Sequence, residues 1–519
     1  MVWLSPRRVV CGRDLSYRWV SFIRLLVRSQ SRCFGSLPAD NCGKKDERYL
    51  FLWLGCHAAE LYISRGFFML CAIPIEISNR ELDGVLYLAL KLVQRGLPVM
   101  FGERMVTQYV KNNNEPVLYF DIEQYVPINR KVIADGGAVF NLNSEGFAFL
   151  CDEKFISIFE HIRDDVTKIF LWGKRQREVV SRQLPDLMQD RLVVSGHPSF
   201  DMAQERFVPY YRNESILQCH GEDYILVNAN SGIFNHAMGL ENYLKMIQKM
   251  DEWQIYRDED YLKFIRTQSE YQEKVANGML ELVAHLARAF PKRHVIIRPH
   301  PTEGMDFYTK PLKRYPNVFV TNEGRVREWI ASARVVVHHD CTTSLEALLM
   351  GKPVIQFRPV YDERFNDPLL AGIGLATGKV EEAEAIVRDG EMPVGLRERQ
   401  LANLEPSLAN IGFVAAEMIA DQAVDVARGV VNTWIPEPLG FWGNVKCWRK
   451  HLSKQLRARQ PGRNGRKVRY ALSKFPRLSL DAVQLRLDKL RVIEPSLPEV
   501  DVTSLTLNTF LMRPRTTMD

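Results

Sequence analysis

Short apolar runs alternate along this chain with segments whose apolar residues recur every three or four positions. The runs are rich in Val, Ile and Leu, which is typical of strands buried on both faces. We expect strands at residues 71–77, 97–101, 138–142, 168–172, 224–227, 294–298 and 335–338. The intervening segments, such as residues 81–96 and 344–350, have the period of amphipathic helices. Because strands that alternate with helices form parallel sheets, the pattern predicts an α/β protein.

The most polar loops follow the strands at residues 294–298 and 335–338. Ligands of parallel sheets collect at the carboxyl ends of the strands, where such loops leave. The candidates are Arg298, His300, Pro301 and Glu303 in the first loop, and Asp340, Thr342, Thr343 and Ser344 in the second. The Thr-Thr-Ser run opens a helix, so its backbone N–H groups, its hydroxyls and the helix dipole favour a phosphate. An ordinary N-cap is the alternative, since Thr and Ser are common caps.

Small and amide residues follow the strand at residues 224–227. They are Asn228, Asn230, Ser231 and Gly232. Such residues permit a close backbone approach and can hydrogen-bond a phosphate or a sugar. The alternative is a plain Asx-turn.

Two further strand ends carry acids. Glu76, Arg80 and Asp83 follow the first strand, where we expect them near the face between domains, with an acid-rich helix start as the alternative. Glu145 precedes a glycine after the strand at residues 138–142, where partial desolvation would tune a general base. Its alternative is a solvated turn residue.

Composition narrows the function classes. With 519 residues the chain is too long for one core, and 46% hydrophobic with 25% charged residues is typical of globular domains. Its nine cysteines form no C-x-x-C pair, which favours a reduced compartment. Cys341 lies beside His338 and His339 but lacks the spacing of a zinc site, so we expect no metal. No G-x-G-x-x-G follows the first strand, which leaves dinucleotide redox chemistry without support.

Both ends of the sequence differ from its middle. Residues 1–68 show no sustained period, and their apolar runs are shorter than the ~20 residues that span a bilayer. We expect translation to start at or near Met69, with residues 1–68 upstream of the protein or disordered. Residues 441–480 contain twelve Lys/Arg and no Asp/Glu, interleaved with aromatic residues. That mixture suits an anionic membrane surface, with a merely solvated basic extension as the alternative. No nucleic-acid motif accompanies the charge, so we expect no nucleic-acid partner.

Two sequence blocks carry a resemblance to a known family. They read R-P-H-P-T-E at residues 298–303 and E-G-R-V-R-E-W-I-A-S-A-R-V-V-V-H-H-D-C-T-T-S-L-E-A-L-L-M-G-K-P-V-I at residues 323–355. They resemble bacterial surface carbohydrate biosynthesis proteins, a group similar to glycosyltransferases of the GT-B fold. The resemblance extends over roughly residues 70–425. It implies two Rossmann-like domains facing across a cleft, with a sugar nucleotide bound mainly on the C-terminal one.

The resemblance also implies roles for single residues. The family usually has D-E-E-G where this chain has N-S-E-G, which implies a base at Glu145, and its acid and arginine fall at Glu76 and Arg80. A similar N-x-N-x-G-x-x-N-H block begins here at Asn228. Transferases that use CMP-activated sialic acid or Kdo have similar His-Pro and Ser/Thr pairs that hold CMP. The matching pairs here are His300-Pro301 and Thr342-Thr343. Asn143 and Ser144 depart from the acidic pattern.

Together these patterns and the resemblance predict a cytoplasmic GT-B glycosyltransferase that moves a sugar from a nucleotide-activated donor to a surface polysaccharide or glycolipid. A CMP-Kdo-like donor is what the resemblance alone implies. In this interpretation Arg298, His300 and the helix start at Thr342 hold the phosphate, and Glu346 reaches the ribose. Glu145 deprotonates the acceptor, and no metal or other cofactor is required. The rivals are a UDP-sugar 2-epimerase and a non-catalytic protein that binds sugar nucleotides.

The expected domains are an atypical segment at residues 1–68, an acceptor domain at 69–205, a nucleotide-sugar domain at 206–440 with closing helices, and a basic tail at 441–519. Through that tail we expect a peripheral position on the inner face of the cytoplasmic membrane.

Overall fold

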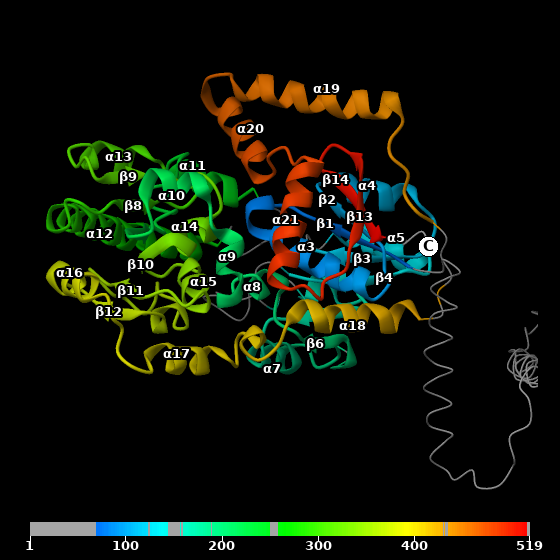
Figure 1. Cartoon of the computed structure of the whole chain (residues 1–519), viewed down its shortest axis with the longest axis horizontal. Helices are drawn as coiled ribbons and strands as arrows, with labels where there is room; N and C mark the ends of the chain where they lie inside the picture. The colour runs from blue at the N-terminus through cyan, green and yellow to red at the C-terminus, as the bar shows by residue number, and fades with distance from the viewer. Residues whose placement is uncertain are drawn as a thin grey trace, which may run out of the picture. The chain divides into compact units, whose positions relative to one another are not determined.

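The computed structural model describes residues 69–122, 125–143, 156, 159–187, 189–249, 258–428, 430 and 434–515. The predictions for residues 1–68 and for Glu145 fall outside these ranges. The described chain forms two mainly parallel sheets, each with helices on both faces (Figure 1).

The first sheet has the strand order β13-β14-β2-β1-β3-β4-β5-β6. Its parallel strands are β1 (Leu70–Pro74), β2 (Val99–Gly102), β3 (Val117–Asp121), β4 (Ala138–Asn141), β5 (Lys168–Leu171) and β6 (Leu192–Val194). Strands β13 (Val500–Thr506) and β14 (Thr509–Pro514) join antiparallel beside β2. Its helices are α3 (Ser78–Gln94), α4 (Met105–Asn112), α5 (Val126–Ala134), α7 (Lys174–Gln183), α8 (Pro198–Asp201), α9 (Val208–Tyr211), α18 (Ala415–Ala427) and α21 (Leu480–Ile493).

The second sheet is wholly parallel, with the order β12-β11-β10-β7-β8-β9. Its strands are β7 (Tyr224–Asn228), β8 (Val295–Arg298), β9 (Val318–Val320), β10 (Ala333–His338), β11 (Val354–Phe357) and β12 (Leu375–Thr377). Its helices are α10 (Glu214–His220), α11 (Leu240–Ile247), α12 (Glu259–Ala289), α13 (Asp306–Leu312), α14 (Val326–Ser332), α15 (Thr343–Leu349), α16 (Val380–Asp389) and α17 (Leu396–Leu404). Counted from β7, this order is 3-2-1-4-5-6, that of dinucleotide-binding Rossmann sheets, and it reverses between β7 and β10.

The prediction of an α/β protein with two Rossmann-like domains is confirmed by these two sheets. Each expected strand is present, with bounds that shift by at most a few residues. The strands are predictable because they are buried on both faces: Val295, Ile296 and Ile297 of β8 have no exposed surface.

One apolar cluster joins the two domains. It includes Leu86 of α3, Tyr211 of α9, Trp329 of α14 and Leu345 of α15, and it covers one face of each sheet. The opposite faces have clusters of their own, under α4, α5 and α7 in the first domain and under α12, α13 and α16 in the second. A shared core makes free hinge motion between the domains costly, because opening would expose apolar surface.

Helix α18 returns the chain from the second domain to the first, as expected. Its buried face is built from Ile419 and four alanines, Ala415, Ala416, Ala420 and Ala423, whose small side chains allow close packing on α3 and α8. The carboxylate of Asp201 caps its start, accepting from the backbone N–H groups of Ala415 at 2.9 Å and Ala416 at 2.8 Å. A carboxylate at a helix N-terminus satisfies donors that have no partner within the helix.

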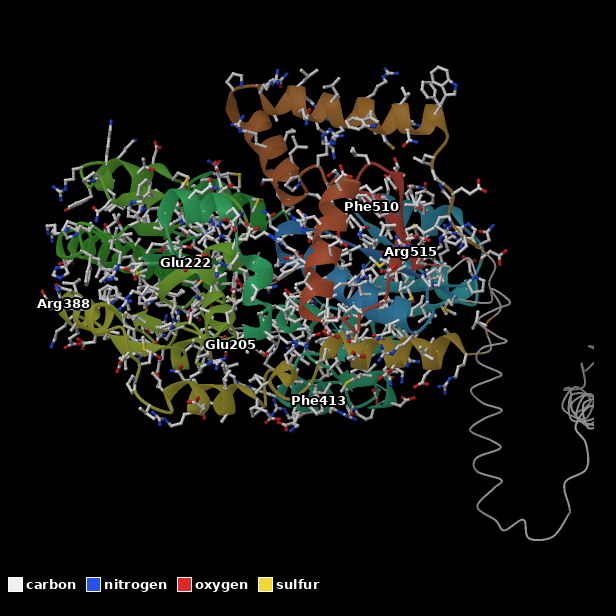
Figure 2. The ribbon with its side chains drawn as sticks, viewed as in Figure 1. Glu205, Glu222, Arg388, Phe413, Phe510 and Arg515 are labelled. Atoms are coloured by element: carbon white, nitrogen blue, oxygen red, sulfur yellow. The ribbon has the colours of Figure 1, made fainter. Side chains whose placement is uncertain are left out.

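The expected basic tail at residues 441–519 needs a correction, because its last part belongs to the first domain. Phe510 of β14 stacks on Phe101 of β2, with ring centroids 5.6 Å apart (Figure 2). Helix α21 buries Val483, Leu487 and Leu490 in the core that both domains share. Only α19 (Phe441–Ala458) and α20 (Gly462–Lys474) remain as the basic extension.

The hairpin of β13 and β14 turns at Asn508, which has a positive φ of 58°. Asn tolerates this left-handed conformation better than most residues. Strand β13 begins with an alternation of apolar and polar residues at Val500, Asp501 and Val502, which is a strand signal, whereas the sequence T-F-L-M-R-P of β14 does not alternate. Within the described ranges, no helix combines the length and the apolar composition needed to cross a membrane.

Candidate functional site

A cavity of about 210 Å³ lies at the carboxyl ends of the strands of the second sheet. It sits where the strand order reverses, between the loops that follow β7 and β10. Asn230 contributes from the end of β7, His300 from β8, Asp340 and Thr342 from β10, Tyr271 from α12 and Asp367 from the segment after β11. Side chains distant in sequence therefore converge on one space.

Asp340 lies two residues after the end of β10 and has a positive φ of 48°, which is uncommon for a residue other than glycine. Its carbonyl accepts from Asn230 Nδ2 at 2.8 Å, and its Oδ1 accepts from the backbone N–H of Asp367 at 3.1 Å. Burial raises the pKa of Asp340 to about 7. A positive φ at a residue other than glycine, together with a buried carboxyl of raised pKa, is typical of a functional position.

Asp367 supplies a second carboxyl to the cavity wall. Its Oδ1 accepts from the backbone N–H groups of Leu369 at 2.8 Å and Leu370 at 3.3 Å. Burial raises the pKa of Asp367 as well. The cavity thus holds two carboxyl groups, and among the described residues that line it there is no Lys or Arg.

The floor of the cavity is a neutral hydrogen-bonded network. His339 Nδ1 donates to the carbonyl of Phe357 at 2.9 Å, and burial lowers the pKa of this imidazole. Its Nε2 lies 3.2 Å from Asn366 Nδ2, while Tyr271 donates its hydroxyl to Asn366 Oδ1 at 2.6 Å. Since Nδ1 carries the proton, Nε2 is the acceptor, and the network fixes the amide of Asn366.

The three residues of the predicted Thr-Thr-Ser phosphate site have different surroundings in the structure. Thr342 is exposed and lines the cavity. Thr343 Oγ1 instead accepts from Asn228 Nδ2 at 2.8 Å, and Ser344 is buried, with its hydroxyl donating to the carbonyl of Cys341 at 2.7 Å. Two of the three hydroxyls therefore already have partners within the protein, Thr343 a side chain at the end of β7 and Ser344 a local carbonyl.

The loop after β8 is organised by Glu303. Its Oε1 accepts from the backbone N–H groups of Ser231 at 3.1 Å and His300 at 2.9 Å, and Tyr308 donates its hydroxyl to Oε2 at 2.6 Å. Glu303 is buried, so it holds two loops together, while His300 and Pro301 are exposed.

Gly232 is needed for this close approach of the two loops. A Cβ at this position would lie 2.7 Å from Thr302 Oγ1. Such a contact would push the loop after β7 away from the loop after β8.

Arg298 and Glu346 are directed to other partners. Arg298 donates to the carbonyls of Glu323 at 2.7 Å and Gly324 at 3.3 Å, and burial lowers its pKa to about 10, so it stays charged at neutral pH. Glu346 Oε1 accepts from Arg327 at 2.6 Å. The guanidinium of Arg298 thus fixes the loop after β9, and Glu346 belongs to a network between the domains.

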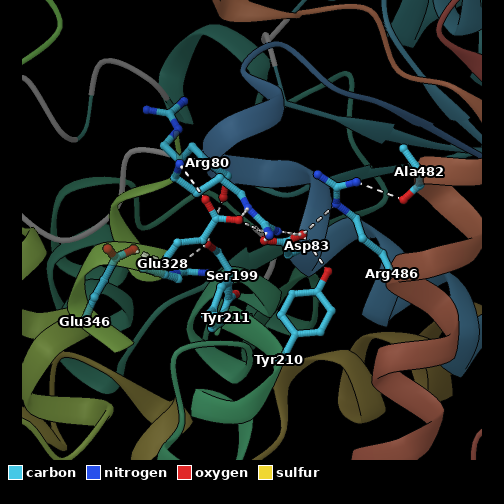
Figure 3. Close-up of polar contacts among 11 residues, drawn as sticks. Arg80, Asp83, Ser199, Tyr210, Tyr211, Glu328, Glu346, Ala482 and Arg486 are labelled. Carbon is cyan, nitrogen blue, oxygen red and sulfur yellow. Dashed lines mark hydrogen bonds and ion pairs between the residues drawn. The ribbon is translucent and has the colours of Figure 1, made fainter. Parts of the chain in front are cut away.

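That network centres on Asp83 of α3, which we expected near this face (Figure 3). Arg325 Nη1 donates to both carboxylate oxygens of Asp83 at 2.7 Å, and the Tyr210 hydroxyl donates at 2.7 Å. Arg486 Nε of α21 lies 3.5 Å from the same carboxylate. Burial alone would raise the pKa of Asp83, but Arg325 and Arg486 outweigh it and hold the pKa below its usual value.

Glu76 and Arg80, the other two residues expected near this face and candidates for a catalytic role, also have partners. Glu76 forms an ion pair with Lys474 of α20, and Arg80 pairs with Glu81 at 2.9 Å. Neither lines the cavity.

Comparison with known proteins gives structural matches alone: no family model and no curated protein matches the sequence. The UDP-GlcNAc 2-epimerase of Neisseria meningitidis bound to UDP-GlcNAc has 12% identity and a TM-score of 0.44, over 69% of this chain and 99% of that one. The Methanocaldococcus jannaschii UDP-GlcNAc 2-epimerase, in complex with UDP-GlcNAc and UDP, has 11% identity and a TM-score of 0.43, over 69% and 100%. The wall teichoic acid polymerase TagF has 10% identity and a TM-score of 0.40, over 63% and 77%.

Sequence reasoning missed Tyr271, Asn366 and Asp367. Tyr271 lies in α12, whose apolar period indicated only a core helix. Asn366 and Asp367 precede a proline, and that turn signal was the available clue. Among the described residues, no three His, Cys, Asp or Glu side chains lie together as they would to hold a metal ion.

Proposed function

We propose that this protein binds a nucleotide sugar at the cavity of the second sheet and transfers its sugar to a glycan or glycolipid acceptor. One observation carries the proposal: the cavity lies where the strand order of a Rossmann-type sheet reverses. Loops on either side of such a point diverge and leave a crevice for a nucleotide.

The residues that line the cavity favour binding of the uncharged part of the nucleotide sugar inside it. Two carboxyl groups without a lining cation would repel a phosphate but accept hydrogen bonds from sugar hydroxyls. Asp340 and Asp367, rather than Glu346, are therefore our candidates for the ribose. The phosphate would lie at the mouth, near the exposed His300 and Thr342. A volume of about 210 Å³ encloses only part of such a ligand, since enclosed sites for drug-sized ligands span about 300–1,000 Å³.

Binding is tested first by thermal shift against UDP, CMP, GDP and CDP. A nucleotide that binds only the folded protein raises its melting temperature by mass action. The expectation that CMP is the preferred nucleotide rests on the family resemblance alone. The thermal-shift panel tests it directly. A panel in which no nucleotide raises the melting temperature would contradict the proposal.

Calorimetry with the preferred nucleotide then compares His300→Ala with His285→Ala. His300 lines the cavity, whereas His285 pairs with Glu384 on the outer side of α12. Loss of one hydrogen bond to a charged phosphate corresponds to about 1.5–3 kcal/mol, or roughly ten- to a hundred-fold in affinity. We expect that loss for His300→Ala and wild-type affinity for His285→Ala. Equal affinities in both variants would refute the site.

Turnover is a separate test. Glu145→Gln should leave nucleotide binding intact and lower transfer roughly a hundred- to ten-thousand-fold, as expected for a missing general base. Retention of full activity would refute that role for Glu145.

A UDP-sugar 2-epimerase is the second candidate. The carboxyl of Asp340 favours it, because burial raises its pKa to about 7 and such a group can exchange a proton near neutral pH; burial raises the pKa of the neighbouring Asp367 as well. Incubation with UDP-GlcNAc and no acceptor separates the two by NMR: an epimerase forms the 2-epimer, whereas a transferase needs an acceptor. A protein that only binds sugar nucleotides gives neither product.

A further inference from the structure

Helix α19 has a surface unlike that of the other described elements. None of its residues is buried, and its 18 residues include five Lys/Arg and no Asp or Glu. It also exposes five large apolar side chains: Phe441 74%, Trp442 78%, Trp448 43%, Leu452 55% and Leu456 54%. Soluble surfaces rarely gather so many large apolar residues on one helix.

These side chains are ordered by the helical period. Phe441, Trp448, Leu452 and Leu456 recur at spacings of seven, four and four residues, which places them on one stripe of the helix. Basic side chains occupy the adjoining side, where Lys446, Arg449, Lys450, Lys454 and Arg457 line a shallow groove with Ser453. We call the two stripes together the α19 face.

The α19 face is held away from both sheets by α20 and by a contact at the start of the helix. Asn444 accepts from the hydroxyl of Thr506 in β13 at 3.0 Å. At the far end of α20, Lys474 pairs with Glu76 and Phe475 is buried in the core of the first domain. Side chains project from α19 both away from the rest of the molecule and toward it (Figure 2), and the guanidinium of Arg477 lies over the Trp448 ring, 4.8 Å from its centroid. The helix is therefore fixed at its base while its outer face stays open.

We propose that the α19 face docks on the surface of an anionic lipid bilayer. The apolar stripe would enter the boundary between headgroups and acyl chains, and the flanking Lys and Arg would contact lipid phosphates. A nucleic acid would use the basic side chains and stack on the aromatic rings, but it offers nothing to Leu452 and Leu456, which extend the same stripe. An apolar stripe beside a basic one matches the two layers of a lipid interface.

The test uses the full chain and cosedimentation with vesicles of phosphatidylglycerol and phosphatidylcholine, or of phosphatidylcholine alone. We expect binding to the anionic vesicles only. A triple variant, Lys446→Gln, Lys450→Gln and Lys454→Gln, should bind about a hundred-fold more weakly, at about five-fold per charge. Because these side chains are exposed, its urea midpoint should equal that of the wild type.

A matched control removes three exposed charges from the second domain: Lys263→Gln, Lys274→Gln and Lys292→Gln. It should bind as the wild type does, and equal weakening in both triples would show an effect of net charge and overturn the proposal.

Insertion is tested with brominated lipids, which quench tryptophan at the acyl boundary. Quenching in the wild type should fall in the double variant Trp442→Phe and Trp448→Phe. Absence of vesicle binding, unchanged quenching, or tighter binding to single-stranded RNA than to vesicles would each refute the proposal. The assays measure no turnover, so they stand apart from the proposed transfer activity.

Discussion

Asp83→Asn is the sharpest test of the contact between the domains. The carboxylate of Asp83 is 6% exposed and its partner Arg325 is 13% exposed, so the pair is shielded from water. Asn has nearly the same shape but no charge, and its amide group would face the guanidinium. Removal of one partner from a buried ion pair costs about 3–5 kcal/mol. Arg325 retains Glu328 at 2.6 Å, so we expect the lower end, about 3 kcal/mol of unfolding free energy.

The pH of the measurement follows from the pKa of Asp83. Because Arg325 and Arg486 outweigh burial and keep this pKa below its usual value, the pair stabilises the folded state above the unfolded pKa of about 3.9. The contribution is lost as the pH falls through the lowered folded value. At pH 7 the whole contribution is therefore present.

The assay is urea unfolding at pH 7, followed by circular dichroism. Asp421→Asn is the matched control, because Asp421 pairs with Arg95 at 2.7 Å but is 65% exposed, and an exposed pair contributes about 0–1 kcal/mol. A double-mutant cycle with Arg325→Met should give a coupling energy of about 2 kcal/mol or more. If Asp83→Asn cost no more than the control, or if the cycle were additive, the assigned role of the pair would be refuted.

Three more predictions follow from other parts of the structure. The pKa of Asp340 is raised to about 7, so ionisation of its carboxyl destabilises the folded state as the pH rises from about 4 through 7. The melting temperature of Asp340→Asn minus that of the wild type should therefore increase from pH 5 to pH 8. A difference that stays constant over this range would contradict the prediction. Gly102 has a φ of 141°, and Gly102→Ala would place a Cβ 2.1 Å from the carbonyl oxygen of Asn508, so this variant should have a clearly lower melting temperature. The control Gly412→Ala should not, because a Cβ at that position has no atom within 4 Å. Equal melting temperatures would argue against the pairing of β2 and β14. A chain that ends at residue 475 lacks α21 and the hairpin of β13 and β14. Limited proteolysis of this chain should degrade the first domain while the second domain resists. Resistance of both domains would show that the first domain does not need the hairpin.

The positions of the parallel strands could be predicted because runs such as Val335 to Val337 have one physical explanation, burial on both faces. His300 and Thr342 could be placed at the cavity because both follow strand ends. The direction in which the Arg298 side chain points could not be predicted, because the carbonyl groups to which it donates lie in a loop that begins about 25 residues later in the chain. Asp367 and Tyr271 reach the cavity from separate segments, and one sequence does not show which long loop folds over which strand end.

The pairing of β14 with β2 also sets an order of events during synthesis. Asn508 bonds to Glu103 across 405 residues of chain, whereas the second sheet is built from one continuous stretch. At about 5–20 residues per second, a ribosome needs about 20–80 s to make the intervening chain. For that time the edge of β2 has no partner strand, and an open edge is a template for pairing with another chain. The first domain therefore begins to form early yet is the last to close, and a nascent chain that stalls before β14 leaves an edge open to aggregation.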